Sequence, residues 1–331
     1  MEFVKIKGTD VESSRIGLGA WAIGGWLWGG SEERESIDTV HAALDKGITL
    51  IDTAAIYGFG RSEEIVGKAV SEYGGRDKIV IATKAGLDWT SGKVYRNSTK
   101  ERIFKEVDDS LERLQTDYID IYQIHWPDFE APFEEAAEAM QEIYNSGKIK
   151  AIGVSNYTIE HMDIFRKIAP LHTSQPPYNL FERGIEEDIM PYCKEHDITM
   201  LLYGGICRGL LSGRMNSQTT FEGDDIRKVD PKFKQPRFKQ YLNAVQKLDE
   251  FAQENYNKRV IHLALRWVLD KADSDITLWG ARRPSQLEPL NDIFGWSLDE
   301  SAFKEIDNIL NETISDPVGP EFMAPPVKGR L

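Results

Sequence analysis

The sequence is poor in the residues that build several common kinds of site. It has two cysteines, Cys193 and Cys207, and six histidines among 331 residues. Because the cysteines do not form a C-x-x-C pair, neither a disulfide framework nor a cysteine-rich zinc site is expected, which favours a reducing compartment. No apolar run reaches the roughly 20 residues of a membrane span, and the first residues, MEFVKIKGTD, lack the apolar stretch of a secretory signal. We therefore expect a cytoplasmic protein that does not enter a membrane.

Positive charge is also scarce. Lys and Arg number 40 against 54 Asp and Glu, which gives a formal net charge of −14. Domains that bind nucleic acid usually carry a basic surface, so nucleic acid is not an expected partner. With 41% hydrophobic and 28% charged residues, the chain has the composition of a folded domain, which excludes disordered and collagen-like classes.

Apolar runs alternate with amphipathic helical stretches along the chain. We expect eight strands, at residues 16–20, 48–51, 79–83, 119–124, 151–154, 172–174, 198–202 and 276–279. Residues 31–46 predict a helix that Ser31 caps and Gly47 ends, and residues 132–146 predict another with Pro132 in its first turn. Continuous apolar strands separated by helices indicate a parallel sheet covered on both faces. Their number favours an α/β fold of the (β/α)8 TIM barrel type over an open sheet.

Three segments fall outside this repeat, within one predicted domain that spans residues 1–331. Residues 1–15 hold two apolar runs around the turn Lys7-Gly8-Thr9-Asp10, which predicts a β-hairpin that plugs one end of the barrel. Residues 207–258 are a long insertion after the seventh strand, and insertions of that length are usually functional or disordered. Residues 313–331 include four prolines between Asp316 and Lys328, so we expect an irregular tail.

Polar and aromatic residues follow the predicted strands in order along the chain. In a (β/α)8 barrel the loops after the strands build the active site, so such residues converge on one face. They are Trp21, Asp52, Lys84, His125, Ser155, Asn156, Gln175, Tyr203 and Gly280. An acid, a base, an imidazole, amides and aromatic rings at successive strand ends predict a site that carries chemistry.

Several short motifs carry a resemblance to a known family. They are Asp52-Thr53-Ala54 with Tyr57-Gly58, Ser62-Glu63 with Gly67, Ala82-Thr83-Lys84, Gln123-Ile124-His125 and Gly153-Val154-Ser155-Asn156. On these motifs the chain resembles the aldo-keto reductase superfamily from about residue 17 to residue 281. The segments Trp26-Leu27-Trp28-Gly29-Gly30 and Leu201-Leu202-Tyr203-Gly204, and the tail at residues 316–322, are similar to bacterial family 11, the general-stress and glycerol dehydrogenase-like reductases. The resemblance implies carbonyl reduction with NADPH.

The residues themselves support a proton-transfer site. Hydride delivered to a carbonyl carbon leaves an oxyanion that must be protonated, and a phenol can supply that proton if its pKa of about 10 is lowered. We expect Tyr57 to be this acid and the Lys84 ammonium to lower its pKa. Asp52 would pair with Lys84, and His125 would donate to the carbonyl oxygen. Taken singly, each residue has a structural alternative, but their succession on three strand ends and one loop favours the catalytic interpretation.

The glycine motifs of the common nucleotide sites are missing. No G-x-G-x-x-G opens a helix after a predicted strand, and the segment around Gly67-Lys68 lacks the residues of a P-loop, so neither a Rossmann domain nor a P-loop is expected. By resemblance, Ser155, Asn156 and Gln175 bond the nicotinamide carboxamide, and Tyr203 stacks on its ring. By the same resemblance, the loop that follows Tyr203 wraps the pyrophosphate, and its glycines let the backbone approach closely. The residues of this loop are Gly204, Gly205, Ile206, Cys207, Arg208 and Gly209.

An acidic protein that binds an anionic dinucleotide needs a local basic patch. The last two predicted loops supply five arginines, Arg208, Arg214, Arg227, Arg282 and Arg283. Arg282 is expected to bind a 2′-phosphate, which favours NADPH and NADP+ over NADH, whereas Arg214 and Arg227 fit a surface role equally well. The predicted cofactor set also includes Gly280, Ala281 and Gln286. Where the family usually has an asparagine, four residues after Gln286, this chain has Leu290.

Tryptophans near the predicted strand ends give the site an aromatic wall. Trp21, Trp26, Trp89 and Trp126 are expected to pack a small organic carbonyl, although Trp28 and Trp89 fit a role as loop anchors equally well. The sequence has no cluster of His and carboxylate residues that would predict a metal site. A metal-dependent barrel hydrolase is therefore disfavoured. The leading interpretation is an NADPH-dependent reductase of small aldehydes or ketones, reversible as a glycerol-type polyol dehydrogenase, with no assigned oligomeric state. The alternative is a nicotinamide-binding regulatory or scaffold protein with little turnover.

Overall fold

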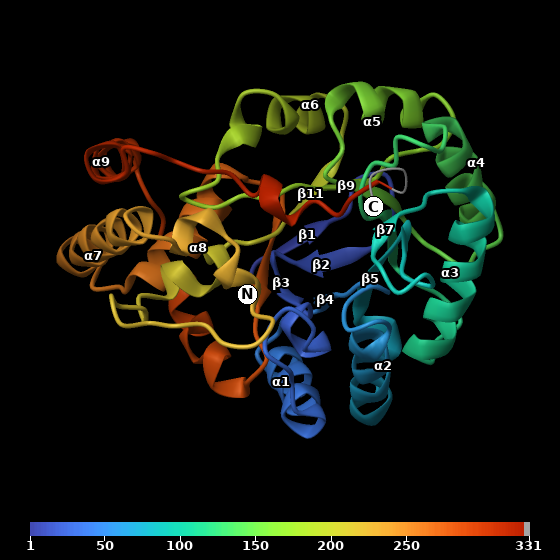
Figure 1. Cartoon of the computed structure of the whole chain (residues 1–331), viewed down its shortest axis with the longest axis horizontal. Helices are drawn as coiled ribbons and strands as arrows, with labels where there is room; N and C mark the ends of the chain where they lie inside the picture. Colours follow the sequence, from blue (N-terminus) through green and yellow to red (C-terminus); the bar gives the residue numbers. More distant parts are fainter. Residues whose placement is uncertain (328–331) are drawn as a thin grey trace.

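Eight parallel strands close into a barrel at the centre of the molecule (Figure 1). The structure is a computed structural model, and it describes residues 1–327. The barrel strands are β3 (Ile16–Gly19), β4 (Leu50–Asp52), β5 (Val80–Ala85), β8 (Ile121–Ile124), β9 (Ile152–Ser155), β10 (Thr173–Gln175), β11 (Thr199–Leu202) and β12 (Ile276–Gly280). They neighbour one another in chain order, and β12 pairs with β3 to close the sheet. The predicted (β/α)8 barrel is confirmed, with every strand boundary within two residues of the prediction.

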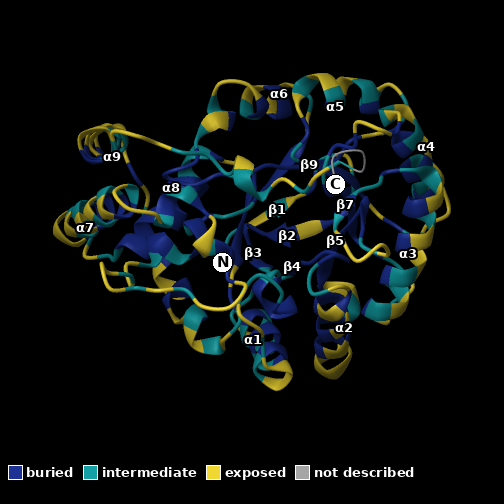
Figure 2. Cartoon of the chain, in the orientation of Figure 1, coloured by how far each residue is buried: buried dark blue, intermediate teal, exposed yellow. Residues whose placement is uncertain are grey.

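Helices surround the barrel and cover its outer face (Figure 1). They are α1 (Glu33–Asp45), α2 (Arg61–Tyr73), α3 (Lys100–Leu114), α4 (Phe133–Asn145), α5 (Ile159–Arg166), α6 (Ile189–Glu195), α7 (Arg237–Tyr256), α8 (Val260–Lys271) and α9 (Glu300–Thr313). Figure 2 shows the outward faces of these helices exposed and the barrel strands largely buried. This arrangement follows from the apolar stripe that each amphipathic helix turns toward the sheet. No helix in residues 1–327 combines the length and apolar character that crossing a bilayer requires.

The first residues of α1 differ from the prediction. Ser31 does not cap the helix, because its hydroxyl donates instead to the carbonyl of Ile23, at 2.7 Å, in the loop after β3. The N-cap is Glu32, whose carboxylate accepts from the backbone N–H of Glu35 at 3.0 Å. Gly47 follows the helix with φ of +84°, a conformation that glycine adopts without steric cost, as predicted for the helix end.

The N-terminal hairpin closes the end of the barrel at which the strands begin. Strands β1 (Phe3–Lys5) and β2 (Glu12–Ser14) pair antiparallel around the predicted turn. Between them, Ile6 and Val11 are buried among inward-facing residues of the barrel such as Leu50 and Ile121. The backbone N–H of Lys7 also donates to Thr199 at the start of β11. The predicted plug is therefore present, and the opposite end of the barrel is left to the loops that follow the strands.

Two segments outside the repeat reach the mouth of the barrel. After β11 the chain makes short 3₁₀ turns, η4 (Cys207–Ser212), η5 (Ile226–Lys228) and η6 (Pro231–Phe233), before α7 begins. After α9 the tail runs across the barrel to the small antiparallel pair β6 (Leu87–Asp88) and β7 (Tyr95–Arg96), where Val327 bridges to Arg96 (Figure 1). The tail is irregular as expected, apart from one turn, η8 (Glu321–Met323). Its predicted residues 328–331 lie outside the described part of the chain.

Candidate active site

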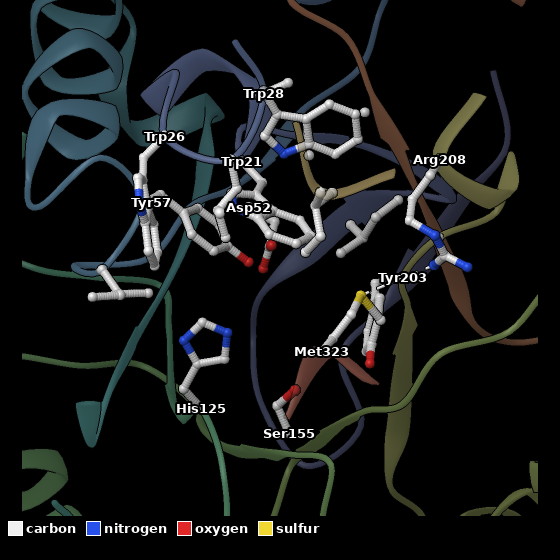
Figure 3. Close-up of a pocket in the computed structure, with 18 of the residues that line it drawn as sticks. Trp21, Trp26, Trp28, Asp52, Tyr57, His125, Ser155, Tyr203, Arg208 and Met323 are labelled. Atoms are coloured by element: carbon white, nitrogen blue, oxygen red, sulfur yellow. Dashed lines mark hydrogen bonds between the residues drawn. The ribbon is translucent and has the colours of Figure 1, made fainter. Parts of the chain in front are cut away.

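The carboxyl ends of the barrel strands open into a cavity of about 270 Å³. All but one of the residues predicted at the strand ends line it, namely Trp21, Asp52, His125, Ser155, Asn156, Gln175, Tyr203 and Gly280. The exception is Lys84 on β5, which is buried outside the lining and reaches Asp52 with its Nζ. Figure 3 shows Tyr57 and His125 on one side of the cavity and Tyr203 and Arg208 on the other.

A buried ion pair places Asp52 on the floor of the cavity. Lys84 Nζ lies 2.7 Å from one carboxylate oxygen of Asp52 and donates to the carbonyl of Thr53 at 2.8 Å. The amide of Gln175 donates to the other Asp52 oxygen at 2.8 Å, so both carboxylate oxygens have a donor. Asp52 is 3% exposed and Lys84 1%. Burial lowers the pKa of Lys84, and the neighbouring Asp52 carboxylate opposes that shift.

Tyr57 lies above this ion pair, in the loop between β4 and α2. The Nζ of Lys84 is 5.1 Å from the centre of its ring. The imidazole of His125 lies edge-on to the same ring, with 5.7 Å between ring centres, and the indole of Trp21 stacks on it at 5.8 Å. The phenol, the imidazole and the ion pair therefore meet at one point of the cavity.

The backbone around Tyr57 is fixed by a contact between two glycines. A Cβ added at Gly58, where φ is +64°, would lie 2.2 Å from the carbonyl oxygen of Gly24. A Cβ at Gly24 would lie 2.7 Å from the carbonyl carbon of Tyr57. Since neither position has room for a side chain, the loops after β3 and β4 touch through their backbones. This contact sets the position from which Tyr57 enters the cavity.

The protonation states at this point follow from burial. Burial, together with the negative charge of Asp52, raises the pKa of Tyr57 well above its ordinary value. Burial and the positive charge of Lys84 hold the pKa of His125 well below its ordinary value. The expectation that Lys84 lowers the pKa of Tyr57 is therefore wrong, because burial, and after it the Asp52 carboxylate, raise that pKa instead. Near neutral pH the site presents a phenol O–H and a neutral imidazole.

Hydroxyl and amide groups continue across the cavity from β9 to β11. Ser155 Oγ donates to the carbonyl of Gln175 at 2.8 Å, and the amide of Asn156 donates to Ser155 Oγ at 3.0 Å. The same amide donates to the carbonyl of His125 at 3.1 Å, while its oxygen accepts from the hydroxyl of Tyr203 at 2.9 Å. Asn156 adopts φ of +60°, which its short polar side chain tolerates. These bonds link the loop that carries His125 to the opposite wall.

Arg208 lines the cavity, but its charge is already matched. Its Nε donates to Asp230 at 2.6 Å, and its Nη2 donates to Glu182. Lys232 adds a second cation on Glu182 at 2.8 Å and donates to the carbonyl of Gly319 in the tail at 3.1 Å. All four charged side chains of this group are buried. We call Arg208, Glu182, Asp230 and Lys232 the buried charge cluster, and it fastens the tail to the loop after β11.

The other predicted arginines differ in their surroundings. Arg282 is half-buried at the edge of the cavity and donates to the carbonyls of Trp28 at 2.6 Å and Gly30 at 3.3 Å. Arg227 lines the cavity and pairs with Asp225. Arg283 is exposed and lies 3.2 Å from Glu35, whereas Arg214 is exposed and lies outside the cavity lining.

Most of the predicted cofactor residues come together in the cavity. Besides those at the strand ends, the lining includes Gly204, Ile206, Arg208, Gly209, Arg227, Ala281, Arg282 and Gln286. Gly205 and Cys207 are buried outside the lining; a Cβ at Gly205 would lie 2.6 Å from Thr277 Oγ1, so this glycine packs on β12. Leu290, the departure from the family pattern, is fully buried in the core.

The predicted aromatic wall is present except at Trp89. Trp21, Trp26 and Trp126 line the cavity, whereas Trp89 packs against Phe59 and Arg102 outside the lining, as a loop anchor. Sequence reasoning missed several apolar lining residues, Leu27, Ile56, Leu87, Val94, Ile226, Met323 and Pro325. Ile56, next to Tyr57, and Leu27, between Trp26 and Trp28, carried a signal. The others lie in loops, in the two-residue strand β6, in the turn η5 and in the tail, where no period indicates which side chains turn inward.

Within residues 1–327, no three or more His, Cys, Asp or Glu side chains gather in a way that could hold a metal ion.

The chain as a whole is similar to known proteins. A profile of the Aldo/keto reductase family matches residues 15–311. The chain is 61% identical over 331 residues to the aldo-keto reductase YhdN of Bacillus subtilis (strain 168), with 100% of both chains covered. It is 34% identical over 307 residues to the NADH-specific methylglyoxal reductase of Escherichia coli (strain K12), covering 87% of this chain and 91% of that protein.

A solved structure agrees with these sequence matches. The glycerol dehydrogenase AKR11B4 from Gluconobacter oxydans superimposes with a TM-score of 0.88 at 50% identity, covering 97% of this chain and 99% of that one. Aldo/keto reductases are oxidoreductases that use a nicotinamide cofactor on small carbonyl or alcohol compounds. By profile, sequence identity and fold together, this chain belongs to the aldo/keto reductase family.

Proposed function

We propose that the protein is an NADPH-dependent reductase of small aldehydes and ketones that also runs in reverse as a polyol or alcohol dehydrogenase. The observation that carries the proposal is the meeting of the Tyr57 phenol and the neutral His125 imidazole above the Asp52–Lys84 ion pair. A protonated phenol can give up a proton, and a neutral imidazole can donate one N–H. Both groups reach the same part of an apolar cavity, which is the requirement for protonating a carbonyl oxygen.

When bound, the nicotinamide cofactor supplies hydride to the carbonyl carbon. Tyr57 would donate its proton to the carbonyl oxygen as negative charge develops there, and His125 would donate its N–H to the same oxygen. A preorganised donor of this kind typically contributes a factor of about 10² to 10³ in rate. The Lys84 ammonium, near the Tyr57 ring, would favour the phenolate that remains. Asp52 would keep Lys84 charged in spite of burial.

The residues around the cavity fit a dinucleotide. Gly280 lines the cavity, and a Cβ there would meet no atom within 4 Å, so the missing side chain leaves room for a ligand. Ser155, Asn156 and Gln175 line the cavity with a hydroxyl and two amides, and part of their present hydrogen bonds to protein groups would be exchanged for bonds to a carboxamide. Tyr203 presents its ring beside them. We propose that these groups hold the nicotinamide end.

Positively charged side chains away from the proposed nicotinamide site support NADPH over NADH. Arg282 and Arg227, which pairs with Asp225, line the cavity, and Arg283 follows Arg282 in the chain, exposed and 3.2 Å from Glu35. The Gln286 side chain accepts from the backbone N–H groups of Arg282 at 2.9 Å and Arg283 at 3.1 Å, which fixes the loop that carries both. A phosphate monoester carries about −1.5 to −2 charges near neutral pH, so a 2′-phosphate would be attracted here. One relative is described as NADH-specific, so the feature of this chain that supports NADPH is this group of arginines.

Loss of NADPH absorbance with the purified protein tests the function directly. The panel contains glyceraldehyde, methylglyoxal and aromatic aldehydes, is repeated with NADH, and is run in reverse with glycerol and NADP+. We expect turnover with NADPH preferred. Tight NADPH binding without turnover on any carbonyl would instead favour a regulatory or scaffold protein.

The Tyr57→Phe variant tests the proposed acid. We expect it to reduce kcat by about 10²-fold or more, because the ring remains but the proton is lost. NADPH binding, followed by fluorescence titration, should be unchanged. Activity near the wild-type level in this variant would show that another group protonates the carbonyl oxygen.

A further inference from the structure

One side of the cavity is walled by uncharged side chains. Trp26, Val94 and Trp126 pack with Ile56, Leu87 and Tyr57 in an apolar cluster separate from the main core. Apart from the Tyr57 hydroxyl and the Trp26 and Trp126 indole N–H groups, these side chains offer a ligand only carbon. All six residues line the cavity. We call this set, without Tyr57, the apolar wall.

The tail extends the apolar wall. Met323 and Pro325 line the cavity and come from the segment that crosses the mouth of the barrel. Arg96 holds that segment, because its Nε donates to the carbonyl of Pro325 at 2.9 Å and its backbone N–H donates to the carbonyl of Pro326 at 3.1 Å. The tail therefore adds a thioether and a proline ring, and no charge, to this side.

The charged residues of the cavity lie elsewhere. Of the side chains that line it within residues 1–327, the charged ones are Asp52, Arg208, Arg227 and Arg282. Asp52 is matched by Lys84, and Arg208 is held in the buried charge cluster on the Tyr203 side (Figure 3). Arg227 and Arg282 pack against Trp28, the first over its ring at 5.4 Å and the second on its carbonyl.

Arg96, the cation that anchors the tail, is turned away from the cavity. Its Nη1 donates to the carbonyl of Pro127 at 2.8 Å, and its guanidinium lies 5.4 Å over the ring of Trp126. It is absent from the cavity lining. An anion placed against the apolar wall would therefore face carbon and indole, because the Arg96 guanidinium packs on the Trp126 ring and does not line the cavity.

We infer that the apolar wall makes this site selective for uncharged carbonyl compounds with an apolar or aromatic body, against those whose body carries a carboxylate or phosphate. The inference rests on the proposed function, since it concerns the substrate that Tyr57 would protonate. An apolar body gains free energy by leaving water for this wall. An ionised carboxylate loses its hydration there and finds no cation in return, which is costly.

Two aldehydes that differ only in charge test this selectivity. 4-Carbamoylbenzaldehyde and 4-carboxybenzaldehyde share the ring, the aldehyde and nearly the same shape. We expect kcat/KM for the amide to exceed that for the carboxylate by at least about 10-fold, because only the carboxylate must be desolvated as an ion. Similar values, or a preference for the carboxylate, overturn the inference while leaving the proposed function intact. Reduction of glyceraldehyde with neither benzaldehyde reduced also overturns it, whereas no turnover of any carbonyl overturns the proposed function itself.

A cation placed in the apolar wall provides the second test. Val94 is half-buried in the loop between β6 and β7, so Val94→Lys can place an ammonium at the wall. We expect the amide-to-carboxylate ratio of kcat/KM to fall by about 10-fold relative to Val94→Met, which matches the added length without the charge. Reduction of the amide in both variants shows that they are folded. An identical ratio in the two variants would refute the role assigned to the wall.

Discussion

Tyr57 and His125 are both held in their uncharged forms, and for the same reason. Each lies in a part of the cavity where burial opposes ionisation, so the pKa of the phenol rises and the pKa of the imidazole falls. The Lys84 ammonium survives the same burial because Asp52 lies 2.7 Å away. At the scale of single residues, the site is therefore a pair of neutral donors above one compensated charge.

Removing Lys84 should expose how much the ion pair matters. We expect Lys84→Met to lower the free energy of unfolding by about 3 to 5 kcal/mol, since it leaves the buried Asp52 carboxylate without its cation, and to abolish carbonyl reduction. Urea unfolding followed by circular dichroism measures the stability. The double variant Asp52→Asn, Lys84→Met leaves no unpaired charge, so it should regain part of the stability and stay inactive. Equal stability of the single and double variants would contradict this account.

His125 should make the stability of the protein depend on pH. Its pKa is depressed in the folded protein, so below its ordinary value of 6.5 the unfolded chain binds a proton that the folded chain does not. Stability present above that pH is therefore lost as the pH falls. We expect the wild type to lose about 1 to 2 kcal/mol more than His125→Gln between neutral pH and about pH 5. Parallel stability profiles of the two proteins would count against a neutral, buried His125.

At the scale of elements, the loops after β3 and β4 act as one unit. Gly58→Ala would place a Cβ 2.2 Å from the carbonyl oxygen of Gly24 in a backbone with φ of +64°. We expect it to destabilise the protein by about 3 kcal/mol or more and to reduce kcat by displacing Tyr57. Gly223→Ala is the matched control, because its φ is +60° but a Cβ there meets no atom within 4 Å. It should cost about 1 kcal/mol and leave kcat unchanged, and similar effects of the two changes would refute the steric argument.

The tail is a second element whose position can be tested. Arg96→Met removes the side-chain bonds to the carbonyls of Pro127 and Pro325 and leaves the backbone bond to Pro326 in place. Since Met323 and Pro325 complete the apolar wall, we expect KM for aromatic aldehydes to rise by about 10-fold with kcat changed less. Lys105→Met, on the exposed face of α3, serves as the control. An unchanged KM in Arg96→Met would mean that the tail keeps its place without this residue.

At the scale of the whole molecule, the features that could be predicted from the sequence are those that repeat along it. The eight strands and the residues at their ends follow from apolar periodicity and from the direction of a parallel barrel, which brings Asp52, His125 and Gln175 to one face. Contacts between segments that are far apart in the sequence leave no periodic pattern in it. Met323 and Pro325 reach the cavity because Arg96 and Lys232 hold the tail, and Arg208 faces Glu182 and Asp230 only in the folded chain.

The buried charge cluster has a consequence for the conditions under which the cavity keeps its shape. Dissolved ions weaken attraction between charges that face water, such as Lys5 and Asp10, but act much less on charges that water does not reach. Arg208 and Lys232 belong to the second kind, with exposed fractions of 7% and 0%. The positions of the tail and of the loop after β11, which these two residues hold, should therefore be the same in dilute and in concentrated salt.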